Sequence, residues 1–222
     1  MEALEHVKQQ IKTFVQGCGD TRSLELLDLL AQGKMLRSKL ILKIAGVDEH
    51  SIKLCAVVEM IHAASLLHDD VIDEADMRRG KPSINAMFDN KTSIMFGDIL
   101  YSIAFTQLSQ MDKRIAYTIS NAVTLLSIGE MLDVELTNEF NTSYDAYLDM
   151  IYKKTASLIE ASAKAAAIMA NKDEEAFALY GKNLGLAFQM IDDILDITQD
   201  SSTLGKPALL DFVEGKVTIP YL

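Results

Sequence analysis

The most informative segment of this chain is His62-Ala63-Ala64-Ser65-Leu66-Leu67-His68-Asp69-Asp70-Val71-Ile72-Asp73. It is apolar for two turns and then carries carboxylates at positions i, i+1 and i+4. Residues four apart on a helix share one face, with Cβ atoms about 6 Å apart. Asp69 and Asp73 can therefore bind the same ion or ion cluster, while Asp70 points to one side. Because His62 and Ser65 lie below on the same face, the pattern predicts a metal site over a cavity.

A second copy of the pattern, more than a hundred residues later, is Phe188-Gln189-Met190-Ile191-Asp192-Asp193-Ile194-Leu195-Asp196. It also opens out of an apolar, helix-like segment. One such acidic motif is weak evidence, because most acidic clusters are solvated faces. Buried carboxylates are costly unless they are paired or bind metal. Two copies therefore favour two helices that direct their carboxylates at one shared cluster of hard cations.

The composition indicates an all-α protein. The 222 residues are 49% apolar and contain only three prolines and 11 glycines, a profile typical of a helical bundle. The formal net charge of −11 argues against nucleic acid as a partner. An anionic substrate would then depend on metal ions and on a local basic cluster.

The sequence predicts a cytoplasmic protein. Cys18 and Cys55 have no spacing motif, which fits a reducing compartment without disulfides. The charged N-terminus has no signal-peptide core. The most apolar windows, 54–67 and 161–170, are interrupted by charged or polar residues and fall short of about 18 uninterrupted apolar residues. We therefore expect no transmembrane segment.

Helices are expected wherever apolar periodicity persists between glycine, proline and capping signals. The expected ranges are 3–16, 20–31, an apolar helix ending at residue 45, 51–75, 92–110, 112–138, 143–170 and 174–200. Two basic segments lie between or inside them. Lys34 and Arg37 could face one anion or could be surface charge. Arg78 and Arg79 follow the first aspartates, where they could bind a diphosphate or simply balance nearby carboxylates.

These residues together resemble the trans-isoprenyl (polyprenyl) diphosphate synthases, especially bacterial long-chain members of the octaprenyl diphosphate synthase type. The match runs from Gly33 to Pro220. Its seven ordered motifs are Gly33-Lys34-x-x-Arg37, the first aspartate motif with Arg78-Arg79-Gly80-x-Pro82-Ser83, Gly97-Asp98, Lys154-Thr155, Phe188-Gln189-x-x-Asp192-Asp193-x-x-Asp196, Gly205-Lys206-Pro207 with Asp211, and Glu214-Gly215-Lys216 with Thr218. The resemblance implies a single all-α isoprenoid synthase domain over residues 1–222, in which the aspartate motifs face each other across a deep central cavity.

The resemblance also implies roles for individual residues. Asp69, Asp73 and Asp192 would hold Mg²⁺, about three ions with substrate bound, supported by Asp70, Asp193 and Asp196. Arg78, Lys154 and Lys206 would bind an allylic diphosphate such as farnesyl diphosphate. Lys34, Arg37, His62 and Arg79 would bind isopentenyl diphosphate. Lys216 and Gln189 would also contact substrate, and the catalytic residues would be Asp69, Asp70, Asp73, Lys154, Thr155, Gln189 and Asp192.

The implied reaction is ionisation, condensation and elimination by a homodimeric prenyltransferase. Small residues at Ala64 and Ser65 leave the tunnel below Asp69 open, which predicts a product in the C35–C50 class with Ile61 or Phe105 as candidate floor residues. Ser38 stands where many members have proline, and we expect this change to be harmless. Because family members continue through several more helices, we expect the chain to be C-terminally truncated at Leu222.

Four alternatives explain less of the sequence. A ferritin-like di-iron bundle needs two Glu-x-x-His pairs, and only Glu59 with His62 supplies one. A phosphohydrolase using His68 and Asp69 leaves the second aspartate motif unexplained. A class I terpene cyclase would usually have an aromatic cavity, whereas only 7% of residues are aromatic. A non-catalytic subunit of a heteromeric synthase would tend to lose motif aspartates, all six of which are present.

Overall fold

The computed structural model describes residues 2–138, 140, 142–199, 209–213 and 215–222. These residues are largely helical, and the strands among them are the antiparallel pair β1 (Met77–Arg78) and β2 (Lys81–Pro82). The expected all-α class is therefore confirmed. The chain forms two compact units, Met1–Thr118 with Ala165–Asp173 and Ile119–Lys164 with Glu174–Leu222. The single domain predicted over residues 1–222 stays a prediction.

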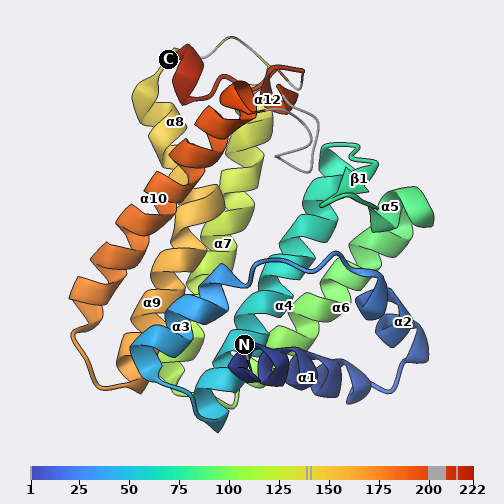
Figure 1. The fold of residues 1–222 in the computed structure, drawn as a ribbon, viewed down its shortest axis with the longest axis vertical. Helices are drawn as coiled ribbons and strands as arrows, with labels where there is room; N and C mark the ends of the chain where they lie inside the picture. Colours follow the sequence, from blue (N-terminus) through green and yellow to red (C-terminus); the bar gives the residue numbers. More distant parts are fainter. Residues whose placement is uncertain (1, 139, 141, 200–208, 214) are drawn as a thin grey trace. The chain divides into compact units, whose positions relative to one another are not determined.

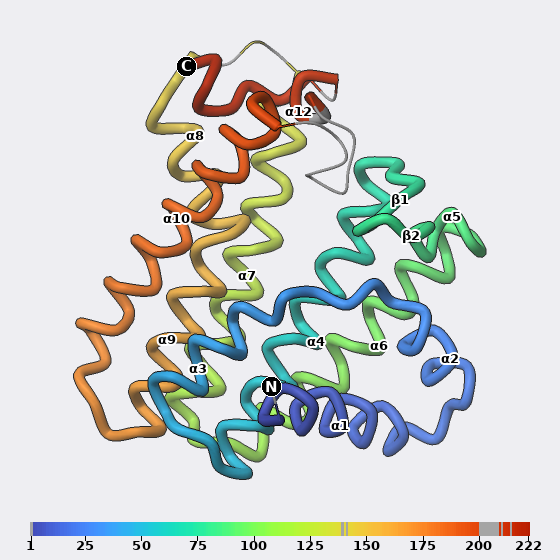
Figure 2. Tube along the Cα trace, viewed as in Figure 1, coloured from blue at the N-terminus to red at the C-terminus, as the bar shows by residue number. Residues whose placement is uncertain are grey.

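The first unit is organised around α4 (Glu49–Ile72), which runs beside α6 (Figures 1 and 2). Helices α1 and α3 also pack against α4. The other helices that lie wholly in this unit are α1 (Glu2–Gln16), α2 (Thr21–Leu29), α3 (Leu36–Ala45), α5 (Ile84–Met87) and α6 (Asn90–Leu108).

Helix α4 has a well-defined start and end. A reciprocal capping box joins Asp48 and Ser51, in which each side chain accepts the other's backbone N–H, at 2.7 Å and 2.9 Å. Its apolar residues point to every side, so the helix is buried nearly all round. It ends with Asp73 as its C-cap, before the predicted Ala75, because the backbone of Glu74 turns to φ +49°.

The second unit contains one long helix interrupted by a π-helical turn. Helix α8 (Tyr144–Ile151) leads into the π-turn η1 (Tyr152–Ala156) and then into α9 (Ser157–Met169), whose last residues, from Ala165, belong to the first unit. A Cβ atom on Gly129 would lie 2.2 Å from Lys154 N, and one on Gly185 would lie 2.5 Å from Ala156 Cα. Both glycines are therefore needed for close packing against the π-turn. The remaining elements are α7 (Lys113–Leu136), which begins in the first unit, α10 (Glu174–Thr198), α12 (Leu210–Val213) and the 3-10 turn η2 (Ile219–Tyr221).

Most predicted helix boundaries are confirmed. The ranges 3–16, 92–110, 112–138 and 174–200 differ from α1, α6, α7 and α10 by at most two residues at either end. Asp20 caps α2 as expected, accepting Ser23 N at 2.9 Å. That helix ends at Leu29, before the predicted residue 31.

Two helices, Glu49–Ile72 and Lys113–Leu136, have the length and composition needed to cross a membrane. This is weak evidence, because core helices of folded proteins have the same properties, and 61% of the most apolar window of Glu49–Ile72 is buried inside the structure. The expected absence of a transmembrane segment therefore stays a prediction.

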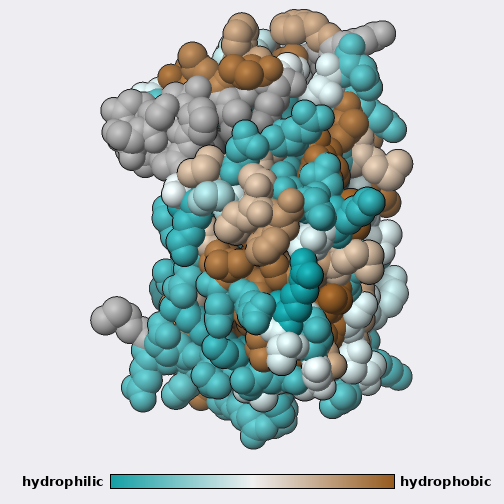
Figure 3. All heavy atoms as spheres, turned by 90° about the vertical axis from the view of Figure 1, so that its right-hand side faces the viewer, coloured by the Kyte–Doolittle hydropathy of each residue, from teal (hydrophilic) through white to brown (hydrophobic). Residues whose placement is uncertain are grey.

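One face of the molecule is largely hydrophilic, with apolar side chains interrupting it (Figure 3). Cys18, which is exposed, and Cys55, which is buried, are both free thiols.

Candidate active site

The first aspartate motif lies at the C-terminal end of α4. Asp73 N donates to Asp69 O at 2.8 Å, so the last turn is α-helical and the two residues have the predicted i, i+4 spacing. Their side chains are partly exposed, whereas Asp70 is buried. Asp69 and Asp73 are thus the two carboxylates of this motif that solvent reaches.

The buried carboxylate of Asp70 forms an ion pair with the partly exposed Arg78. Arg78 Nε donates to Asp70 Oδ1 at 2.7 Å, and its Nη2 donates to the same oxygen. Burial raises the pKa of Asp70, and the hydrogen bond from Arg78 opposes that shift. The sequence offered a basic loop that balances Asp69, Asp73 and Glu74 as one interpretation, whereas the ion pair that Arg78 forms is with Asp70. The same contact holds a guanidinium group next to the aspartate motif.

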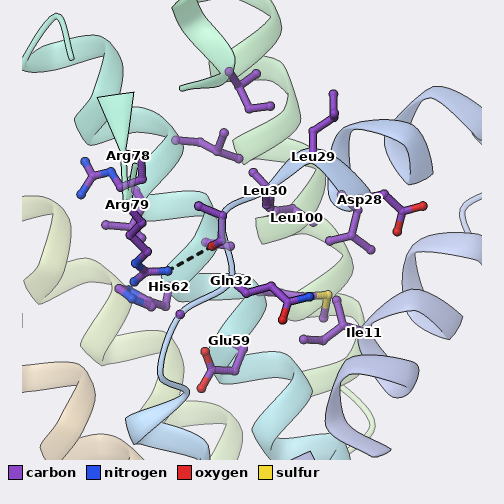
Figure 4. A pocket seen from close by; sticks show the side chains of 18 of the residues that line it. Ile11, Asp28, Leu29, Leu30, Gln32, Glu59, His62, Arg78, Arg79 and Leu100 are labelled. Atoms are coloured by element: carbon purple, nitrogen blue, oxygen red, sulfur yellow. Dashed lines mark hydrogen bonds between the residues drawn. The ribbon is translucent and has the colours of Figure 1, made fainter. Parts of the chain in front are cut away.

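A cavity of about 340 Å³ lies within the first unit (Figure 4). Its lining is mainly apolar, with His62, Arg78 and Arg79 on one side. Arg79 Nη1 donates to Ala31 O at 3.2 Å, the bond drawn in Figure 4. A Cβ atom on Gly33 would lie 2.6 Å from the same nitrogen. The fold thus brings the glycine of the Gly-Lys-x-x-Arg motif against Arg79, more than forty residues later in the chain.

Glu59 is a site residue that the sequence reasoning missed. It lines the cavity, and its charge raises the pKa of Arg37, which burial lowers more strongly. Ser38 donates to Glu59 Oε1 through both its hydroxyl, at 2.7 Å, and its backbone N–H, at 3.3 Å. Proline could donate neither bond. The sequence could have pointed to Glu59, because it is the one acidic residue inside an apolar segment.

His62 is held neutral by its surroundings. Burial lowers its pKa well below the usual value, and the charges of Arg37, Arg79 and Arg78 lower it further. Of the residues predicted to bind isopentenyl diphosphate, Arg37 and Arg79 are thus close enough to His62 for their charges to lower its pKa. The remaining member, Lys34, is exposed just before α3.

The depressed pKa of His62 makes a pH prediction. As pH falls below about 6.5, His62 becomes protonated in the unfolded state while it stays neutral in the folded state. The unfolded state then binds more protons than the folded state, so the unfolding free energy falls by up to about 1.4 kcal/mol per pH unit. We expect His62→Gln to flatten the fall in unfolding free energy between pH 7.5 and 5.5, measured by urea denaturation. The exposed His50→Gln is the matched control. Parallel curves for wild type and His62→Gln would contradict this account.

In the second unit, the π-turn places Lys154 between two buried carboxylates. Its Nζ lies 2.5 Å from Asp133 Oδ2 and 3.1 Å from Glu130 Oε1. Lys216 Nζ lies 3.4 Å from the same Asp133 oxygen, so two predicted substrate-binding lysines meet at one carboxylate. Lys206 lies outside the described residues. The sequence reasoning missed Glu130 and Asp133, although two acids three apart near the end of a largely apolar stretch were a usable signal.

The second aspartate motif is linked to the π-turn through Gln189. Thr155 Oγ1 donates to Gln189 Oε1 at 2.8 Å, and Gln189 Nε2 donates to Asp193 Oδ1 at 2.8 Å. Asp196 is buried and accepts Asp211 N at 3.2 Å, so it anchors the segment around α12. Asp192 is partly exposed on α10. Asp193 and Asp196 therefore each accept a hydrogen bond that ties them to the surrounding structure.

The donor set fits magnesium, which prefers carboxylate oxygens and water. Asp69 and Asp73 form a pair in the first unit, and Asp192 belongs to the second. Across the part of the chain that the structure describes, no three histidine, cysteine or acidic side chains form one metal-binding group. The predicted three-ligand set thus stays a prediction. The same holds for the product-length residues Ala64 and Ser65, both of which are buried in α4.

Comparison with known proteins identifies the family. The family model "Polyprenyl synthetase" matches residues 24–222. A prenyl transferase of Synechocystis is 43% identical over 176 residues, and octaprenyl diphosphate synthase of Escherichia coli is 41% identical over 175 residues. In each case the match covers 77% of this chain and 54% of the relative. The chain thus spans about half the length of the curated relatives it matches.

Solved structures agree. Octaprenyl pyrophosphate synthase from Helicobacter pylori superposes with a TM-score of 0.93 at 48% identity, covering 100% of this chain and 74% of that one. A Caulobacter crescentus polyprenyl synthase, solved with calcium and isoprenyl diphosphate, gives a TM-score of 0.91 at 36% identity, covering 99% and 70%. The isoprenoid synthase fold expected from the sequence is therefore confirmed. The chain belongs to the polyprenyl synthetase family.

Proposed function

We propose that this protein is a Mg²⁺-dependent trans-prenyltransferase that condenses isopentenyl diphosphate with an allylic diphosphate such as farnesyl diphosphate. The observation that carries the proposal is the pairing of two partly exposed carboxylates at the end of α4 with the partly buried guanidinium group of Arg78. Asp69 and Asp73 stand beside Arg78, which Asp70 holds in place. Binding a metal-bridged diphosphate requires negative carboxylates for the metal and positive side chains for the phosphate oxygens. The named relatives make prenyl diphosphates.

The proposed reaction begins with loss of diphosphate. The allylic carbon–oxygen bond breaks, and its electron pair leaves with the diphosphate. Arg78 and Lys154 bind that leaving group, and Asp69, Asp73 and Asp192 would hold Mg²⁺, which neutralises the developing negative charge when bound. Thr155, Gln189 and the Lys154 carbonyl direct their dipoles at the allylic cation.

The condensation then forms one carbon–carbon bond. Lys34, Arg37, His62 and Arg79 bind isopentenyl diphosphate, whose double bond supplies the electron pair. The departed diphosphate accepts the proton that is lost as the new double bond forms. Charges therefore balance without a separate protein base. We further propose that the enzyme is a cytoplasmic homodimer.

The product is proposed to be a long all-trans polyprenyl diphosphate in the C35–C50 class. Ser65 is small and lies one turn below Asp69 on the same face, where a larger side chain would stop the growing chain. We expect Ser65→Phe to shorten the product by several isoprene units, seen by chromatography of the dephosphorylated products. Ser65→Ala is the control and should leave the length unchanged. An unaltered product distribution in Ser65→Phe would reject this role.

The alternative is a non-catalytic or regulatory subunit of a heteromeric synthase. It keeps the fold but would not turn over alone. Measuring diphosphate release by the isolated protein, with both substrates and Mg²⁺, separates the two. We expect turnover without a partner. A folded protein that reacts only after a second subunit is added would favour the alternative.

A further inference from the structure

We propose that Tyr147 and Asp193 are positioning residues that set the orientation of the Gln189 carboxamide. The inference rests on the proposed prenyltransferase function and adds two residues with a role of their own. They are linked to the π-turn by a continuous chain of hydrogen bonds within the second unit. Tyr147 and Gln189 both donate to Asp193. Gln189 in turn accepts a hydrogen bond from Thr155, which belongs to the π-turn.

The geometry of this chain is tight. Tyr147 Oη donates to Asp193 Oδ2 at 2.5 Å, while Gln189 Nε2 donates to the other oxygen, Oδ1, at 2.8 Å. The carboxylate is therefore shared by two donors, one from α8 and one from its own helix α10. Asp193 is 3% exposed and Tyr147 is fully buried, so water does not compete freely for either group.

The chemistry of the groups fixes the direction of the amide. An ionised carboxylate only accepts hydrogen bonds, so the Gln189 NH₂ group must face Asp193. The carbonyl oxygen Oε1 then faces Thr155 and accepts its hydroxyl proton. Without an acceptor at Asp193, the amide could rotate by half a turn and exchange its oxygen for its nitrogen at this position.

That orientation matters for the proposed reaction. An amide oxygen carries the negative end of the group dipole and stabilises a nearby cation, whereas the NH₂ end opposes it. Tyr147 is proposed to contact neither substrate. It orients the Gln189 carboxamide through its hydrogen bond to Asp193. Its ring packs in a buried cluster with Met150 and Ile151, which holds the hydroxyl in position before substrate arrives.

The test is a double-mutant cycle between Tyr147 and Gln189. We expect Tyr147→Phe to lower kcat about tenfold, with KM for both diphosphates changed less than about twofold, because binding is unaltered. In a Gln189→Met background, the same substitution should change kcat less than about twofold. Tyr144→Phe, which removes a half-exposed hydroxyl from the same helix, is the matched control and should leave kcat unchanged.

A readout independent of turnover is the ¹⁵N resonance of the Gln189 side-chain amide, assigned by its loss in Gln189→Met. We expect it to shift in Tyr147→Phe and to stay in place in Tyr144→Phe. An unmoved resonance, or an equal kcat loss in both Gln189 backgrounds, would overturn the positioning role. An inactive wild-type protein would overturn the proposed function instead, and with it the catalytic consequence drawn here.

Discussion

Replacing Asp69 by asparagine is expected to lower kcat about a thousandfold, the size of effect seen when a main stabiliser of developing charge is removed. Asp69 is one of two partly exposed carboxylates at the end of α4, spaced one turn from Asp73. Asparagine keeps the shape and one oxygen, but it loses the negative charge that holds Mg²⁺. The folded structure should be little affected, with a change in unfolding free energy within about 0.5 kcal/mol.

The matched control for Asp69→Asn is Glu74→Gln. Glu74 is exposed, lies in the turn just after the motif and carries the same charge. If loss of any nearby negative charge were enough, both variants would be equally slow. The account expects Glu74→Gln to retain most of the wild-type rate in a steady-state assay. A near-normal rate in Asp69→Asn would contradict the assignment of Asp69 as a metal ligand.

Replacing Lys154 by methionine is expected to reduce both stability and turnover. Lys154 is the cation between Glu130 and Asp133, which are 8% and 5% exposed. Removing Lys154 takes the cation from Glu130 and leaves Asp133 with Lys216 at 3.4 Å, which we expect to cost about 3 kcal/mol of unfolding free energy. Loss of a cation that binds the leaving diphosphate should also lower kcat about a hundredfold.

A triple variant separates the two effects of Lys154. Combining Lys154→Met with Glu130→Gln and Asp133→Asn removes the buried negative charges together with their cation. Urea denaturation should show most of the lost stability restored, because the two buried carboxylates that lacked Lys154 are no longer charged. Turnover should stay low, because the diphosphate still lacks its cation. Recovery of turnover along with stability would contradict a direct role for Lys154.

Helix positions could be predicted because they depend on local signals. Asp20 lies just before the residues it caps, and the apolar spacing of α1, α6 and α10 is visible in any short window. The end of α4 could not be predicted in this way, since it depends on the positive φ of Glu74. That conformation has no reliable signature in a glutamate.

The aspartate motifs could be predicted because spacing on one helix is a local property. Their partners could not, because they come from distant segments. Glu130 and Asp133 reach Lys154 only because Gly129 lets α7 approach the π-turn closely. Likewise, Tyr147 meets Asp193 across 46 residues of sequence.

Ser38 shows the limit of reasoning from a family pattern. From the family pattern alone, serine at position 38 in place of proline is expected to be harmless. In the structure its hydroxyl and its backbone N–H both bind Glu59, a residue with no assigned role in the sequence. The replacement therefore creates a contact that proline could not make. Its effect depends on a side chain 21 residues away.

The most direct test of the proposed function is product formation by the purified protein. The protein is incubated with labelled isopentenyl diphosphate, farnesyl diphosphate and Mg²⁺, and the dephosphorylated products are sized. We predict a ladder that ends at one long prenyl chain and that disappears with EDTA or in Asp69→Asn. A folded wild-type protein that yields no elongated product, with or without Mg²⁺, would contradict the account.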